Sequence, residues 1–155
     1  MIFNAEQTAA ALPYSLLAEA IHTLLLDGSV KVPSRLVHSL SDTSSLFVMP
    51  ASDNRLAITK LITFVADNPA RHLPAIQGDV VVFDAVNGRR LCVLDGPTVT
   101  ARRTAAVSLL AAQLLAPKPN GKLLIVGAGV QGRSHLEAFA QGLRVKEVRV
   151  ASRSS

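Results

Sequence analysis

The sequence predicts an α/β protein in which a strand-rich N-terminal domain precedes the first βαβ unit of a dinucleotide-binding domain. Three observations predict this arrangement. A short apolar strand at 123–126 enters a glycine-rich turn at 127–132, and a helical pattern and a second strand at 145–150 follow. Alternating and apolar runs predict several strands between residues 46 and 94. A Pro-, Asn- and Gly-containing segment at 117–121 separates the two parts.

The N-terminal part begins with a predicted helix. Asn4 is a suitable helix cap, with Gln7 three residues later, and a helix from about Leu12 to Leu26, with apolar residues at helical spacing, follows. Pro13 suits the first turn of this helix. The pattern indicates an element that packs and carries no chemistry.

The middle of the chain is expected to form strands joined by turns. The strands are expected over residues 46–49, 56–64, 75–84 and 91–94. Pro50 is expected to close the first strand, and Asn87-Gly88 is the strongest hairpin signal in the chain. Thr98 or Thr100 is expected to cap a helix that ends at about Leu115.

The segment after this helix places a domain boundary near residue 118. Residues 1–118 are then one domain, and residues 119–155 begin a second one. The second part holds a single βαβ unit, whereas a complete dinucleotide-binding domain needs further strands. We therefore expect the 155 residues to be the N-terminal part of a longer polypeptide.

The turn Gly127-Ala128-Gly129-Val130-Gln131-Gly132 fits the pattern G-x-G-x-x-G. Gly127 permits a tight turn, Gly129 leaves room for a pyrophosphate, and Gly132 allows the helix to lie close to the strand. The helix N-terminus then offers unpaired N–H groups to an anion. The alternative is an ordinary glycine-rich turn that binds nothing. The predicted apolar face of the helix consists of Val130, Leu136, Phe139 and Ala140.

The residues after the second strand indicate the preferred cofactor. NAD sites usually carry Asp or Glu about 20 residues beyond the glycines. Here Ser152 and Arg153 follow the strand, and both can donate hydrogen bonds to a 2′-phosphate. The sequence thus predicts NADP(H) in preference to NAD(H). The alternative is that Arg153 is a solvated residue at the start of a loop.

Composition excludes several classes of function. The net charge is +5, but the basic residues are scattered and aromatic residues make up only 4% of the chain, which argues against nucleic acid as a partner. The longest apolar stretch, 109–116, is too short to span a membrane, and the N-terminus lacks a signal-peptide pattern. The single cysteine, Cys92, is expected in the core and fits a cytoplasmic protein. The four histidines lack metal-ligand spacing, and His135 is expected at the surface.

Four cationic residues are candidates for chemistry. Lys60 lies in an apolar strand that is expected to be largely buried, so it must reach the surface, pair with an acid or meet a substrate. Arg102 and Arg103 fall in the first turns of a helix, where a cation opposes the helix dipole. One of them is expected to have an anionic partner, unless both face solvent. Arg35, in another apolar context, raises the same question.

Several unusual motifs occur together in this chain. They are Arg35, Met49-Pro50, Lys60 within AITKLIT, DNPARHLPAIQG at 67–78, TARRTAA at 100–106 and VGAGVQG at 126–132. In this order they resemble the ornithine cyclodeaminase/μ-crystallin family across nearly the whole chain. The doubled arginine and the SRS at 152–154 most resemble bacterial Δ1-pyrroline-2-carboxylate (ketimine) reductases.

The resemblance implies a fold and a set of residue roles. It implies an N-terminal substrate-binding and dimerisation domain of the α+β type with a mostly antiparallel sheet, then a Rossmann domain, and a homodimer formed through the N-terminal sheets. Arg35 and Arg103 would bind the substrate carboxylate. Lys60 would face the reacting nitrogen or the carboxylate and act in catalysis. Ala75 replaces a threonine that helps to bind substrate in some cyclodeaminases, which counts against ornithine.

The function predicted from these residues is reduction of a cyclic ketimine carboxylate by NAD(P)H. The substrate would be Δ1-pyrroline-2-carboxylate or Δ1-piperideine-2-carboxylate, and the product L-proline or L-pipecolate. The alternatives are an ornithine cyclodeaminase that retains NAD and releases ammonia, a μ-crystallin-like NADPH-binding protein, and an alanine or opine-type dehydrogenase. The expected partners are a small anionic imino or amino acid and a second copy of the chain, with no nucleic acid and no membrane.

Overall fold

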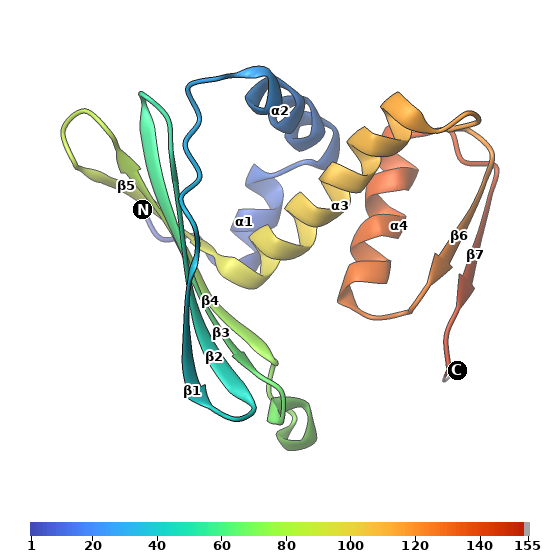
Figure 1. Ribbon diagram of the computed structural model, residues 1–155. Coiled ribbons are helices and arrows are strands. Elements are labelled where there is room, and N and C mark those ends of the chain that lie inside the picture. The colour runs from blue at the N-terminus through green and yellow to red at the C-terminus, as the bar shows by residue number, and fades with distance from the viewer. Residues whose placement is uncertain (154–155) are drawn as a thin grey trace. The chain divides into compact units, whose positions relative to one another are not determined.

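The computed structural model describes residues 1–153, and its contacts divide the chain into two units (Figure 1). The sheet unit comprises residues 1–8 and 27–99, and the helical unit comprises residues 9–26 and the chain from residue 100 onward. Helices α1 (Ala5–Ala11) and α3 (Gly96–Leu115) each run across the division. The predicted domain boundary near residue 118 concerns the functional domains and stays a prediction.

The sheet unit is built on five antiparallel strands in the order β1-β2-β3-β4-β5. Their bounds are Leu36–Ser41, Ser44–Ser52, Leu56–Val65, Ile76–Asp84 and Arg90–Asp95. Each strand pairs with its neighbour in sequence, and the predicted antiparallel sheet is confirmed. A short 3₁₀ helix, Asn68–Arg71, lies between β3 and β4.

The turn between β4 and β5 agrees with the Asn-Gly signal. Gly88 has a φ of +74°, and its N–H donates to the carbonyl of Asp84 at 2.9 Å. Pro50, by contrast, does not end β2, which continues to Ser52. The backbone N–H and C=O of Ser52 bond to Lys31, on the side of β2 where β1 lies. The backbone polar groups of every second residue in a strand point to the same side, so the nitrogen of Pro50 also faces that side. Because β1 begins only at Leu36, opposite Val48, no ladder hydrogen bond is lost there.

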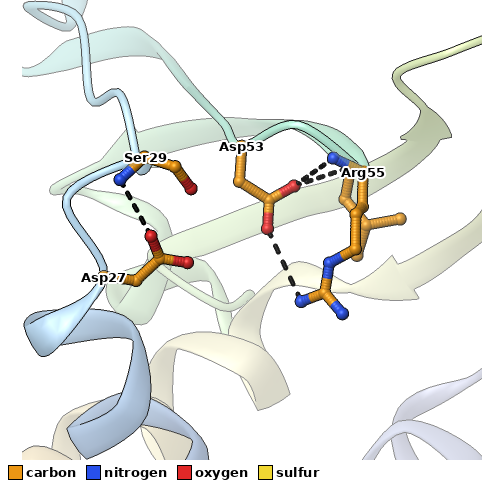
Figure 2. Close-up of polar contacts among 5 residues, drawn as sticks. Asp27, Ser29, Asp53 and Arg55 are labelled. Carbon is orange, nitrogen blue, oxygen red and sulfur yellow. Dashed lines mark hydrogen bonds and ion pairs between the residues drawn. The ribbon is translucent and has the colours of Figure 1, made fainter.

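An aspartate organises the turn between β2 and β3 (Figure 2). The carboxylate of Asp53 accepts the backbone N–H groups of Arg55 at 2.7 Å and of Leu56 at 2.6 Å. These two bonds hold the pKa of Asp53 below its ordinary value, and the nearby Arg55 guanidinium acts in the same direction. Asp27 accepts the N–H of Ser29 at 2.8 Å in a similar turn, and its pKa is also lowered by that bond.

The helical unit packs three helices through small residues. Helix α2 (Tyr14–Leu26), α3 and α4 (Val130–Gly142) share a buried cluster. Its members are Tyr14, Ala18, Ala105, Ala106, Leu109, Leu110 and Ala138. Alanines let the helices approach closely, and a Cβ at Gly142 would overlap the side chain of Leu109.

Two of the expected helix starts agree with the structure, and a third does not. Asn4 and Gln7 cap α1 by exchanging backbone-to-side-chain hydrogen bonds of 2.9 and 3.1 Å, and α2 follows Pro13 and ends at Leu26 as expected. Helix α3 begins at Gly96, because the carboxylate of Asp95 accepts the N–H of Thr98 at 2.8 Å. The expected cap at Thr98 or Thr100 was wrong. Asp95 is the capping residue, and Pro97, two residues later, suits the first turn of the helix.

Strands β6 (Lys122–Val126) and β7 (Glu147–Ala151) form a parallel pair joined by α4, as the βαβ prediction required (Figure 1). Only Ile125 of β6 is buried, whereas Leu124 and Val126 are 63% and 81% exposed. A Cβ at Gly132 of α4 would lie 3.5 Å from Ile125, so α4 covers one face of β6. The short apolar run at 123–126 would be typical of a buried parallel strand, but within residues 1–153 only one face of β6 is covered.

The buried face of α4 agrees only in part with the predicted one. Leu136 and Phe139 are half-buried, and Phe139 packs against the buried cluster, whereas Val130 and Ala140 are exposed. The fully buried residues of the helix are Ser134 and Ala138. Within residues 1–153, no single helix is long and apolar enough to cross a membrane, although α1 and α2 taken together meet the criteria of length and composition.

We expect Asp53→Ala to lower the melting temperature more than Asp53→Asn, because asparagine keeps an acceptor for the two N–H groups. The pKa of Asp53 is lowered in the folded state, so its charged form adds stability above the pKa of the unfolded chain. This contribution is lost as the pH falls through the lower folded-state pKa. Thermal melts of the three proteins from pH 7 to pH 3 test this. Equal melting temperatures at pH 7 would contradict the role of the turn.

Candidate functional site

The glycine-rich turn joins β6 to α4 and leaves the start of the helix without a side-chain cap. Gly127 has a φ of +110°, and its N–H donates to the carbonyl of Ala151 at the end of β7 at 2.8 Å. Gly129 is the N-cap residue in an extended conformation, and its carbonyl accepts the N–H of Arg133 at 3.0 Å. The N–H groups of the first turn are thus available to an anion.

The three glycines have separable tasks. Gly127 requires a left-handed backbone, which L side chains rarely adopt. At Gly132 a Cβ would overlap the carbonyl oxygen of Gly127, so only glycine permits this packing of helix on turn. At Gly129 nothing lies within 4 Å of the missing Cβ. This open space beside an uncapped helix N-terminus fits the pyrophosphate of a dinucleotide.

A pocket of about 550 Å³ lies at the carboxyl ends of β6 and β7. Its lining residues are Val126, Gly127, Ala151, Ser152 and Arg153. The structure thus brings Ser152 and Arg153 next to the first glycine of the turn, where ligands bind in open parallel sheets. The three residues of the motif that are not glycine are exposed: Ala128, Val130 and Gln131.

Lys60 lies at the middle of β3, opposite Met49 on β2 and Val80 on β4. It is half-buried, and Ile62 is the buried residue of this strand, so the expectation of a largely buried strand was wrong. Leu36 of β1 pairs with Val48 of β2, which pairs with Leu61 of β3. Arg35 directly precedes Leu36, so it lies two strands away from Lys60, at the same level of the sheet. At a strand spacing of about 4.8 Å, the backbones of Arg35 and Lys60 lie roughly 10 Å apart.

The two adjacent arginines of α3 have different environments. Arg102 stacks on the ring of Tyr14, with its guanidinium carbon 3.8 Å from the ring centroid, and its Nε donates to the carbonyl of Leu12 at 2.7 Å. Arg103 is exposed, and its side chain has no hydrogen bond or ion pair to any residue in 1–153. Arg102 is therefore structural, and Arg103 is the arginine that is available to an anionic ligand.

Two polar links between helices were missed from the sequence. The hydroxyl of Tyr14 on α2 lies 2.8 Å from Ser134 Oγ and 3.1 Å from a carboxylate oxygen of Glu137 on α4. Burial raises the pKa of this tyrosine. His135 is half-buried instead of at the surface, and it bonds to Ser108 of α3. The lone tyrosine in an apolar helix was a usable signal, whereas nothing in the sequence singled out Ser108.

The part of the chain that the structure describes has no group of three or more His, Cys, Asp or Glu side chains that could hold a metal ion. Cys92 is half-buried on β5. The helical unit therefore carries the glycine turn with its pocket and the exposed Arg103, and the sheet unit carries the candidate cations Arg35 and Lys60.

The family model of the ornithine cyclodeaminase/mu-crystallin family matches residues 5–155, nearly the whole chain. This chain belongs to the ornithine cyclodeaminase/mu-crystallin family. The resemblance carried by the motifs is thereby confirmed, and with it an oxidoreductase fold that binds a nicotinamide cofactor in related proteins.

Curated relatives within this family include reductases. The chain is 43% identical over 141 residues to Delta(1)-pyrroline-2-carboxylate reductase 1 of Burkholderia multivorans, covering 89% of this chain and 45% of that protein. It is 42% identical over 132 residues to the ketimine reductase mu-crystallin of Mus musculus, covering 83% of this chain and 42% of that protein. The chain therefore spans less than half the length of these relatives.

Solved structures of the family share the fold. An archaeal alanine dehydrogenase dimer with bound NAD superposes with a TM-score of 0.84 at 25% identity, over 98% of this chain and 48% of that one. The match extends over both units of this chain. The order of an antiparallel sheet followed by a βαβ element is therefore the order found in the family.

The packing at Gly132 makes a prediction about stability. Gly132→Ala should lower the free energy of unfolding by roughly 1–3 kcal/mol, because the new methyl group overlaps the Gly127 carbonyl. Gly129→Ser is the matched control, since its side chain enters open space and serine is a good N-cap. Chemical denaturation without cofactor measures both. A Gly132→Ala protein as stable as the parent would contradict the close packing.

Proposed function

We propose that the whole protein to which this chain belongs reduces a cyclic ketimine carboxylate with NAD(P)H. The substrate is Δ1-pyrroline-2-carboxylate or its six-membered homologue Δ1-piperideine-2-carboxylate, and the product is L-proline or L-pipecolate. The observation that carries the proposal is the 43% identity to a protein named as a Δ1-pyrroline-2-carboxylate reductase, across nine-tenths of this chain. The 42% identity to a ketimine reductase supports the same chemistry.

The cofactor assignment rests on the glycine turn and its pocket. Residues 127–132 bind the pyrophosphate, with the N–H groups of the first turn of α4 as donors. Ser152 and Arg153 bind the 2′-phosphate of NADP(H), because they line the pocket at the end of β7 and no carboxylate lines it with them. NADP(H) is thus preferred over NAD(H). When bound, the reduced nicotinamide supplies a hydride to the imine carbon.

The substrate assignment rests on the three cations. Arg35 and Arg103 each provide a guanidinium for the substrate carboxylate, which fixes the plane of the imine. Lys60 holds a proton at the imine nitrogen, either directly or through a water molecule. The C=N bond then becomes a C–N bond, with the hydride on carbon and the proton on nitrogen. Lys60 is the catalytic residue in this proposal, and Arg35 and Arg103 are binding residues.

The same proposal includes an assembly and a location. Residues 1–118 form the substrate-binding and dimerisation domain, and residues 119–155 begin the cofactor domain. The protein acts as a cytoplasmic homodimer that associates through its N-terminal sheets. The related archaeal alanine dehydrogenase is described as a dimer, which supports this assembly.

A turnover assay of the intact protein tests the proposed reaction. NADPH absorbance is followed with Δ1-pyrroline-2-carboxylate, the same reaction is run with NADH, and ammonia release from L-ornithine is measured in parallel. We expect oxidation of NADPH at a lower KM than that of NADH, and no ammonia. Ammonia release without net change of cofactor would instead identify a cyclodeaminase. No turnover of either substrate would overturn the proposal.

The different environments of the two arginines predict different effects of substitution. Arg103→Ala should lower kcat/KM by roughly 100-fold, because a charged hydrogen bond to the substrate is lost. The melting temperature should stay unchanged, because the exposed side chain makes no hydrogen bond or ion pair within residues 1–153. Arg102→Ala should lower the free energy of unfolding by about 1–2 kcal/mol through loss of its contacts with Leu12 and Tyr14.

Lys60→Ala is expected to reduce kcat/KM about as much as Arg103→Ala. Steady-state kinetics and thermal melts of the three variants make the comparison. An Arg103→Ala or Lys60→Ala enzyme with the parental kcat/KM would remove that residue from the site.

A further inference from the structure

A histidine connects the glycine turn to helix α3. His135 lies one turn after Gln131, and its Nδ1 is 2.7 Å from the carbonyl oxygen of Gln131. Its other nitrogen, Nε2, is 2.9 Å from Ser108 Oγ on α3. The imidazole thus spans from the fifth residue of the glycine motif to a neighbouring helix, and all three residues belong to the helical unit.

The partners of the ring assign its hydrogens. A carbonyl oxygen only accepts hydrogen bonds, so Nδ1 carries the proton and donates it to Gln131. In the neutral ring Nε2 is then an acceptor, and the hydroxyl of Ser108 donates to it. The 3.3 Å distance from Ser108 Oγ to the carbonyl of Thr104 is longer than the distance to the imidazole, which favours the bond to the ring.

The bond to Gln131 acts on the anion-binding end of α4. The carbonyl of Gln131 and the N–H of Gly132 belong to one planar peptide group and point in opposite directions. A hydrogen bond that holds the carbonyl therefore aims the N–H toward the start of the helix and polarises it as a donor. The same peptide is held from the other side, because Gly132 packs against the carbonyl of Gly127.

We propose that His135 is a positioning residue for the cofactor: anchored by Ser108, it fixes the peptide between Gln131 and Gly132 so that this N–H donates to the dinucleotide pyrophosphate. The inference rests on the proposed function of the glycine turn. It assigns a role to a side chain that does not itself contact the cofactor, and it makes α3 part of the support of the site.

Binding of NADPH to the intact protein, followed by fluorescence titration, tests the role. His135→Leu should raise the Kd roughly fivefold, which corresponds to the loss of one hydrogen bond. Ser108→Ala should raise it in the same direction, and the double variant should bind no more weakly than His135→Leu, because the two residues act as one unit. His135→Asn, which keeps a donor near the position of Nδ1, should recover part of the affinity.

Leu136→Ala is the matched control for destabilisation, since this half-buried residue of α4 makes neither polar contact. It should lower the melting temperature and leave the Kd unchanged when the titration is run well below that temperature, because the apparent Kd equals the native one as long as nearly all the protein is folded. The KM for the imine substrate should stay parental in His135→Leu. A parental Kd in His135→Leu, or an equal rise in Leu136→Ala, would overturn the inference. Failure of the parent protein to bind NADPH or NADH would instead overturn the proposed function.

Discussion

The glycine turn and the start of α4 depend on one constraint, the contact between Gly132 and the carbonyl of Gly127. It sets how closely α4 approaches the end of β6, because any side chain at residue 132 would overlap that carbonyl. With the helix fixed there, its first turn begins at Gly129 without a capping side chain, and the space beside Gly129 is open. An uncapped helix N-terminus is costly unless water or an anion satisfies its N–H groups. The fold therefore maintains a feature whose natural complement is a phosphate.

The polar contacts inside the helical unit support that feature. Alanines at the centre of the unit bring α2, α3 and α4 close together, and close helices allow short side chains to bond across the interface. Ser134 and His135 of α4 use this proximity to bond to Tyr14 and Ser108. In α3, the same proximity places Arg102 against the ring of Tyr14 and leaves Arg103 exposed. Packing thus decides which of two adjacent arginines is available to a ligand.

The sequence predicted the βαβ element, the strands of the N-terminal part and the glycine turn, because these depend on local patterns of apolar residues and glycine, whereas the antiparallel order of the sheet came from the resemblance to the family. It did not predict that Asp95 starts α3, since several nearby residues were suitable caps, or that β2 continues through Pro50, which depends on where the neighbouring strand begins. The buried face of α4 was predicted only in part. Helical periodicity selects large apolar residues, of which Leu136 and Phe139 are half-buried, whereas the fully buried residues are Ser134 and Ala138. The link between Ser108 and His135 joins distant parts of the chain, and no local pattern indicates it.

Binding of dinucleotides to the intact protein and to its Gly129→Val variant tests the role of the glycine turn most directly. The parent should bind NADPH more tightly than NADH, because Ser152 and Arg153 line the pocket at the end of β7. The variant should keep the parental fold but lose affinity for both dinucleotides, since the valine fills the space that is open beside the helix N-terminus. Equal binding by the parent and the variant, or binding of neither dinucleotide by the parent, would contradict this role.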